Sequence, residues 1–169
     1  MKANNVLYVG SLIPRKGVMP LMLSVIMWNM FNPAKIKLIV CGTGILKPLV
    51  IMTSRFSNNI SFKGYQSKSN ISKYLSQSDL FVMLSKREAF GLVYIEALMH
   101  GVPVAMLRDE SFSRFIEDKN MGLVVTDTSY KSLFELFSSE IPSIDQNKLI
   151  ELKKVFSRDS VLKTYKELL

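Results

Sequence analysis

Cysteine and histidine are almost missing from this chain. Its 169 residues include one of each, Cys41 and His100. A single cysteine forms no internal disulfide, so a reducing cytoplasm is the expected setting, and Cys41 is expected to be a small buried residue at a strand end. With His100 as the sole histidine, and with no serine in a nucleophile-elbow context, the sequence offers no basis for a Ser-His-Asp triad.

Long hydrophobic spans and low-complexity tracts are also lacking. The most apolar segment, 18–31, is too short to cross a bilayer and contains Pro20 and Asn29, and no signal peptide precedes it. A hydrophobic share of 48%, with 8 Gly and 6 Pro, is typical of a compact globular protein. We therefore expect one domain over 1–169, large enough for a full core.

Acidic residues are fewer than basic ones. The chain has 14 Asp and Glu and 22 Lys and Arg, which gives a net charge of +8. This balance favours anionic partners. The basic residues are scattered rather than gathered with aromatics, which argues against a nucleic-acid surface. A nucleotide diphosphate and an anionic membrane surface fit better, and the second would place the protein peripherally at the inner membrane face. For most of the lysines, charge that maintains solubility is the simpler interpretation.

Apolar runs alternate with helical patterns along the chain. Strands are expected at 5–9, 36–41, 59–62, 79–84, 102–106 and 122–125, and helices at 18–31, 45–56, 69–77, 91–100, 111–117, 129–138 and 145–168. This alternation predicts an α/β fold, a Rossmann-like doubly wound parallel sheet of about six strands. Ligands of such sheets bind beyond the carboxyl ends of the strands, so the loops there are expected to line one crevice.

Two carboxylates lie eight residues apart around a predicted helix start. Glu88 falls in the loop after the fourth strand, and Glu96 lies inside an almost wholly apolar, and therefore buried, helix. The turn at Phe90, Gly91 and Leu92 would present free backbone N–H groups and a positive dipole end to a phosphate. From Gly91 to Glu96 the helix advances about 7–8 Å. That separation exceeds the roughly 5–5.5 Å of a retaining glycosidase pair and suits an elongated ligand.

Four ordered segments resemble the group 1 (family 4 type) glycosyltransferases, which are retaining enzymes of the GT-B fold. They are the strand and Gly-x5-Lys-Gly loop at 6–17, the strand and glycine turn at 37–44, the strand at 60–65, and the Glu-x7-Glu segment at 85–104. The resemblance implies the C-terminal, nucleotide-sugar-binding half of such an enzyme. It further implies transfer of a hexose from a UDP- or GDP-hexose to a polysaccharide or glycolipid acceptor, with the nucleotide sugar as substrate and no cofactor.

Roles carry over from the family to matching positions. Glu88 would face the sugar as the catalytic carboxylate, Lys16 would bind the diphosphate, and Glu96 would accept hydrogen bonds from the ribose hydroxyls. The residues expected to bind the donor are Ser11, Arg15, Lys16, Gly17, Gly44, Tyr65, Phe90, Gly91, Leu92 and Glu96. Without the motif, Lys16 would be an exposed lysine, Glu88 a loop acid paired with Lys86 or Arg87, and Glu96 a structural partner of His100.

A metal site is not expected. His100 stands four residues after Glu96, a spacing that metal pairs also use, but no third ligand lies near them in the sequence. The reaction that the resemblance implies does not depend on a bound metal. His100 is therefore expected to be packed or paired with Glu96.

Two departures from the family pattern concern the donor. Relatives commonly carry an arginine where this chain has Ser11, so Arg15 is a candidate replacement, and a weaker donor affinity is expected. The segment 107–115 contains no glycine, although relatives usually have a Gly-Gly turn there. This second departure affects sugar selectivity more than the fold.

A GT-B enzyme also needs an acceptor-binding domain ahead of this one, and the opening strand at 5–9 leaves no room for it. We expect that domain to be absent or supplied by a partner chain, with weak or no activity for the chain alone. The alternative is a non-catalytic nucleotide-sugar-binding or partner module, either a remnant or one half of a split enzyme. An unrelated doubly wound domain of the flavodoxin or response-regulator kind would leave the glutamate pair unexplained.

Overall fold

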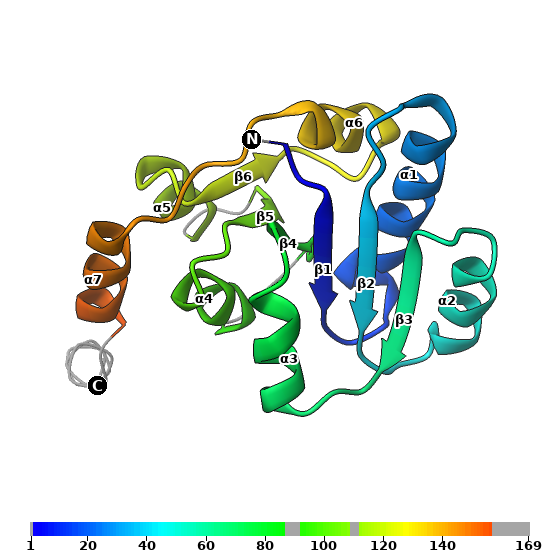
Figure 1. The fold of residues 1–169 in the computed structure, drawn as a ribbon, viewed down its shortest axis with the longest axis horizontal. Coiled ribbons are helices and arrows are strands. Elements are labelled where there is room, and N and C mark those ends of the chain that lie inside the picture. The colour runs from blue at the N-terminus through cyan, green and yellow to red at the C-terminus, as the bar shows by residue number, and fades with distance from the viewer. Residues whose placement is uncertain (1, 87–91, 109–111, 157–169) are drawn as a thin grey trace.

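A computed structural model of the chain describes residues 2–86, 92–108 and 112–156. Within them, six strands form one parallel sheet in the order β3-β2-β1-β4-β5-β6 (Figure 1). The strands are β1 Asn5–Val9, β2 Lys37–Cys41, β3 Ile60–Gly64, β4 Leu80–Met83, β5 Val104–Leu107 and β6 Gly122–Val125. This topology confirms the predicted α/β, Rossmann-like doubly wound sheet.

Helices cover both faces of this sheet. They are α1 Val18–Phe31, α2 Lys47–Ser54, α3 Lys68–Leu75, α4 Leu92–Met99, α5 Phe112–Asp118, α6 Tyr130–Ser138 and α7 Gln146–Val155, and the 3-10 turn η1 spans Pro14–Lys16. The strand order runs outward in opposite directions from β1 and β4, so right-handed crossovers place α1 and α2 on one face and α4 and α5 on the other. Contacts with α1 place α6 on the first face, and α7 packs against α4.

The core lies along the middle of the sheet. Every residue of β4 and β5 is buried, as a strand covered on both faces requires. On the first face, the ring of Trp28 in α1 packs edge-on against Phe134 and Phe137 of α6, with centroids 5.5 and 5.7 Å apart. The Trp28 indole N–H donates a 2.8 Å hydrogen bond to the carbonyl oxygen of Ala34. These contacts fix α1 against α6 and against the loop that leads into β2.

Most element boundaries agree with the sequence predictions to within two residues. The turn η1 was not predicted, although Pro14 at its start and Gly17 after it, with a φ of 69°, explain why it forms and ends there. Of the helix expected at 145–168, α7 accounts for Gln146–Val155, while 157–169 lies outside the described residues. No helix in the described residues is long and apolar enough to span a bilayer.

The loops that follow β1 and β2 cross at very close range. Gly42 has a φ of 146°, and a Cβ atom there would lie 1.9 Å from the carbonyl oxygen of Gly10. At Gly64, where φ is 69°, a Cβ atom would meet nothing within 4 Å. Backbone geometry disfavours a side chain at both of these positions. At Gly42, but not at Gly64, a side chain would also clash with neighbouring atoms.

This difference predicts unequal stabilities for two alanine variants. Gly64→Ala should lower the free energy of unfolding by about 1–2 kcal/mol through its left-handed backbone alone. Gly42→Ala should lower it by about 3 kcal/mol or more, because overpacking adds to the backbone strain. Urea unfolding followed by circular dichroism measures both. Equal losses in the two variants would contradict the close crossing at Gly42.

Candidate functional site

Backbone hydrogen bonds join the loops at the carboxyl edge of the sheet. The N–H of Leu12, after β1, donates to the carbonyl oxygen of Thr43, after β2, at 2.9 Å. The carbonyl oxygen of Leu12 accepts from the N–H of Leu46, also at 2.9 Å. The Gly42 N–H donates to the carbonyl oxygen of Gly64, the last residue of β3, at 2.8 Å. Three loops far apart in the sequence therefore form one continuous surface.

A hollow of about 230 Å³ opens on this surface. All three loops contribute to its walls, which are mostly backbone and apolar side chains with a few polar groups. This is the usual composition of a small-molecule site, at the edge of the sheet where doubly wound folds bind ligands. The lining residues are Val9, Gly10, Ser11, Cys41, Gly42, Thr43, Tyr65, Gln66 and Ile71.

Ser11 and Tyr65 are the predicted donor-binding residues that line the hollow. Tyr65 is 80% exposed, so its ring is accessible at the mouth. Gln66, which directly follows Tyr65, also lines the hollow but was not predicted from the sequence. Its side-chain amide donates to the carbonyl oxygen of Lys63 at 2.6 Å, and its side-chain oxygen accepts from the Asn70 amide at 2.8 Å. The available sequence signal was a polar amide side chain directly after the aromatic residue at the strand end.

Lys16 is buried, whereas Arg15 beside it is exposed. A Cβ atom at Gly17 would lie 2.6 Å from the Cβ of Leu84, so the turn after Lys16 packs directly on the chain that leaves β4. The Lys86 N–H also donates to the carbonyl oxygen of Arg15 at 3.0 Å. The lysine-bearing turn is thus fixed to the segment that leads into the predicted glutamate loop. Neither Arg15 nor Lys16 lines the hollow.

Gly44 also lies outside the hollow's lining. Its φ is 156°, and a Cβ atom there would come within 2.5 Å of the carbonyl oxygen of Leu12. This position therefore requires glycine for the close contact between two loops.

Three predicted residues, Glu88, Phe90 and Gly91, lie outside the described residues. Leu92 and Glu96 belong to α4, where Leu92 is 71% exposed and Glu96 is half-buried. The expectation of a fully buried α4 was therefore wrong. The helix buries Tyr94, Ala97 and Leu98 against the sheet and leaves its opposite side accessible. Glu96 therefore keeps part of its surface accessible.

His100 makes a different contact from the one expected. Its Nδ1 lies 2.9 Å from the backbone carbonyl oxygen of Glu96, and its Nε2 lies 2.6 Å from the Ser72 hydroxyl oxygen. In the neutral tautomer with a proton on Nδ1, the ring donates to the carbonyl and accepts from Ser72. His100 thus links α4 to α3 without pairing with the Glu96 carboxylate. Among the described residues, no three His, Cys, Asp or Glu side chains cluster closely enough to hold a metal ion.

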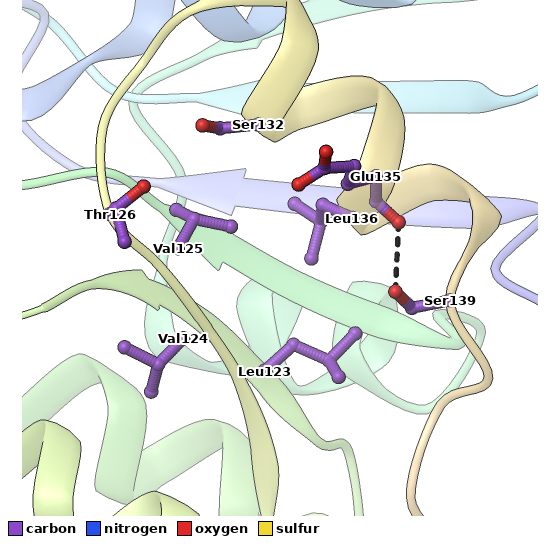
Figure 2. Close-up of a pocket in the computed structure, with 8 residues that line it drawn as sticks. All are labelled: Leu123, Val124, Val125, Thr126, Ser132, Glu135, Leu136 and Ser139. Carbon is purple, nitrogen blue, oxygen red and sulfur yellow. Dashed lines mark hydrogen bonds between the residues drawn. The ribbon is translucent and has the colours of Figure 1, made fainter.

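A second hollow, of about 200 Å³, lies beside β6, the edge strand at the far end of the strand order from β3. Figure 2 shows its lining residues coming from β6 and the following Thr126 on one side and from α6 on the other. The hydroxyl of Ser139 donates to the backbone carbonyl oxygen of Glu135 at 2.8 Å. Among the described residues that line it, Glu135 alone is charged, so these side chains offer no cation to a phosphate.

Comparisons with solved structures define the class of the fold. The chain is similar to the crystal structure of TarM, with a TM-score of 0.80 and 20% identity over 98% of this chain and 34% of that chain. It is also similar to Anabaena Alr3699/HepE, crystallised with UDP and glucose, with a TM-score of 0.77 and 19% identity over 97% of this chain and 47% of that chain. The fold is that of one Rossmann-like half of a GT-B glycosyltransferase.

The family follows from the sequence itself. The family model for glycosyl transferases group 1 matches residues 1–142, and the chain belongs to this family. Over 90 residues it is 30% identical to the alpha-monoglucosyldiacylglycerol synthase of Acholeplasma laidlawii, a match that covers 52% of this chain and 23% of that protein. Over 73 residues it is 32% identical to the N-acetyl-alpha-D-glucosaminyl L-malate synthase of Bacillus anthracis, a match that covers 43% of this chain and 19% of that protein. The matched segments span about a fifth of these relatives.

The thiol in the wall of the hollow gives a chemical test of the geometry. Burial raises the pKa of Cys41 to about 11, against a smaller opposing effect of Lys63. At pH 8 we expect iodoacetamide to modify the folded protein on the order of 100-fold more slowly than the urea-unfolded chain, because only the thiolate reacts. The rate should keep rising as the pH approaches 11. Equal rates in the folded and unfolded chains would contradict the buried position of Cys41.

Proposed function

We propose that the chain is the donor-binding half of a retaining glycosyltransferase. It would transfer a hexose from a nucleotide diphosphate sugar, such as a UDP- or GDP-hexose, to a polysaccharide or glycolipid acceptor. The observation that carries this proposal is the hollow at the carboxyl edge, formed by three hydrogen-bonded loops in a chain of the group 1 family. A second domain or a partner chain would bind the acceptor.

The described residues support a model in which two groups of loops bind different parts of the donor. The hollow, with Tyr65 at its mouth, suits the nucleoside. Lys16 lies in the turn that packs on the end of β4, which supports a role beside the diphosphate. On α4 the half-buried carboxylate of Glu96 is available to the ribose hydroxyls, since an ionised carboxylate accepts from both of them.

Glu88 and the backbone at the start of α4 would stabilise the charges that develop during the transfer. In a transfer with retention, positive charge develops on the sugar and negative charge on the leaving diphosphate. A carboxylate facing the sugar stabilises the first charge. The backbone N–H groups at Gly91 and Leu92, together with Lys16, stabilise the second. Ser11 contributes a neutral hydroxyl where relatives place an arginine, so the diphosphate would be held with fewer charged contacts.

A lipid-linked acceptor would bring the reaction to a membrane surface. The similar Acholeplasma protein is named for a glucosyl diacylglycerol, which supports a glycolipid as one acceptor class. We therefore propose a cytoplasmic protein that acts at the inner face of the membrane. The surplus of positive charge in the chain favours such a location.

Calorimetric titration with UDP, GDP and ADP tests the donor site. We expect one nucleotide to bind saturably and Glu96→Gln to weaken its binding by about 10- to 100-fold, because hydrogen bonds to a charged acceptor are lost. The matched control is Glu135→Gln, which changes an exposed carboxylate at the second hollow and should leave affinity unchanged. If no nucleotide binds at millimolar concentration to the folded chain, or if only Glu135→Gln weakens binding, the assignment fails.

Slow hydrolysis of the bound nucleotide sugar separates a catalytic half from a non-catalytic binding module, the alternative that Ser11 favours. We expect the chain to release hexose slowly and Glu88→Gln to reduce this rate by about 10²–10³-fold, since a group that stabilises transition-state charge is lost. The nucleotide dissociation constant should stay nearly unchanged. Saturable binding without any hydrolysis, or a Glu88→Gln variant that hydrolyses at the parental rate, would support the binding module.

A further inference from the structure

The acidic residues are separated from the first half of the chain. Residues 1–78 contain ten Lys and Arg side chains and no Asp or Glu, and all fourteen acids lie at or after Asp79. The first 78 residues therefore carry +10, while 79–169, with twelve basic residues, carries −2. The basic residues are scattered through the whole chain, as expected. The acidic residues are the ones confined to part of it.

In the fold, the segment without acidic residues forms one side of the molecule. Residues 2–78 form β1, β2 and β3 with α1, α2 and α3, and these strands are one complete half of the sheet. Figure 1 shows α2 beside β3 at the outer edge of that half. No described residue of this half contributes a negative side chain. The field at this edge of the molecule is therefore positive.

An exposed apolar surface lies at the same edge. Leu49 and Met52 on α2 are 38% and 52% exposed, and Ile45 and Phe56, in the turns that begin and end the helix, are 79% and 77% exposed. Their spacing of four, three and four residues places them along one side of the helix. Val50 and Thr53, each about 100° around the helix from the exposed residue before it, are buried. Since α2 already packs on the core, the exposed set is not needed for the fold.

One cation accompanies these apolar side chains. Arg55, exposed at the end of α2, lies about 60° around the helix from Met52, whereas the exposed Lys47 lies about 160° around the helix from Leu49. We define the α2 face as Ile45, Leu49, Met52 and Phe56 together with Arg55. Apolar side chains beside a cation, in a region without acids, match the requirements of a bilayer with anionic headgroups.

We propose that the α2 face docks this protein on an anionic lipid bilayer. The four apolar side chains enter the boundary between headgroups and acyl chains, while Arg55 contacts lipid phosphates. A second copy of the chain fits this face poorly, because a twofold contact would bring two halves of charge +10 together. Single-stranded nucleic acid also fits poorly, since three of the four exposed apolar residues are aliphatic and offer no ring for base stacking.

Docking through α2 orients the candidate site. Ile45 directly follows Gly44, so the start of the α2 face and the hollow lie at the same carboxyl edge of the sheet. A lipid-linked acceptor would then meet the donor on the membrane side of the molecule. This consequence rests on the proposed function, but the docking itself rests on charge and exposure and does not depend on nucleotide binding.

Vesicle sedimentation tests the proposal with phosphatidylcholine alone and with phosphatidylcholine mixed with phosphatidylglycerol. We expect binding to the anionic vesicles only, weakened by added salt. The double variant Ile45→Ser, Phe56→Ser should bind at least about tenfold more weakly, because two large apolar side chains no longer enter the interface. Arg55→Gln should weaken binding about fivefold, the equivalent of about 1 kcal/mol per basic residue.

Matched controls lie in the other half of the chain. Ile150→Ser changes a side chain that is 49% exposed on α7, and Lys131→Gln removes an exposed charge on α6. Both should leave vesicle binding unchanged. The proposal is overturned by equal binding to neutral vesicles or by equal losses in the control variants. It also fails if the double variant merely dissociates a dimer in sedimentation velocity, or if single-stranded RNA is bound and vesicles are not.

Nucleotide titration without vesicles distinguishes this proposal from the proposed function. Variants of the α2 face should bind nucleotide as the parent does, because the changed side chains lie outside the lining of the hollow. Vesicle binding without any nucleotide binding would defeat the donor-site assignment alone. Nucleotide binding without any vesicle binding would defeat the docking surface alone.

Discussion

The backbone of Leu12 holds the candidate site together. Its N–H and carbonyl groups both bond to the loop after β2, at Thr43 and Leu46, and its side chain is fully buried. Buried peptide groups need partners, so this residue can satisfy its own only by keeping the two loops in contact. Gly42 and Gly44 supply the space for that approach. The hollow exists because these loops cannot separate without exposing Leu12 or leaving its peptide unpaired.

The fold could be predicted from the sequence because its signals are local. Buried parallel strands appear as short apolar runs, and turns between them contain Gly or Pro, so β1, α1 and β6 were placed correctly by pattern alone. The hollow was only partly predictable. Ser11 and Tyr65 follow strands and were found, whereas Ile71 comes from α3 and reaches the hollow through tertiary packing that no short-range pattern contains.

Burial of single side chains was harder to predict than the elements that bear them. The apolar composition of α4 suggested a helix enclosed on all sides, yet Leu92 is largely exposed and Glu96 is half-buried. Composition reports the apolar surface that a helix carries, not the amount that its neighbours cover. The same distinction applies to α2. Its sequence is as apolar as that of a core helix, but several of its apolar side chains lie on the surface.

The strand order also has a consequence for the chain as it is synthesised. β1 lies inside the finished sheet, between β2 and β4, but β4 begins only at Leu80. Until that segment leaves the ribosome, a sheet of β1, β2 and β3 has an unpaired strand at β1, the kind of edge that promotes pairing between nascent chains. The same 78 residues carry +10. Mutual repulsion between such chains opposes their aggregation during the interval in which the edge is open.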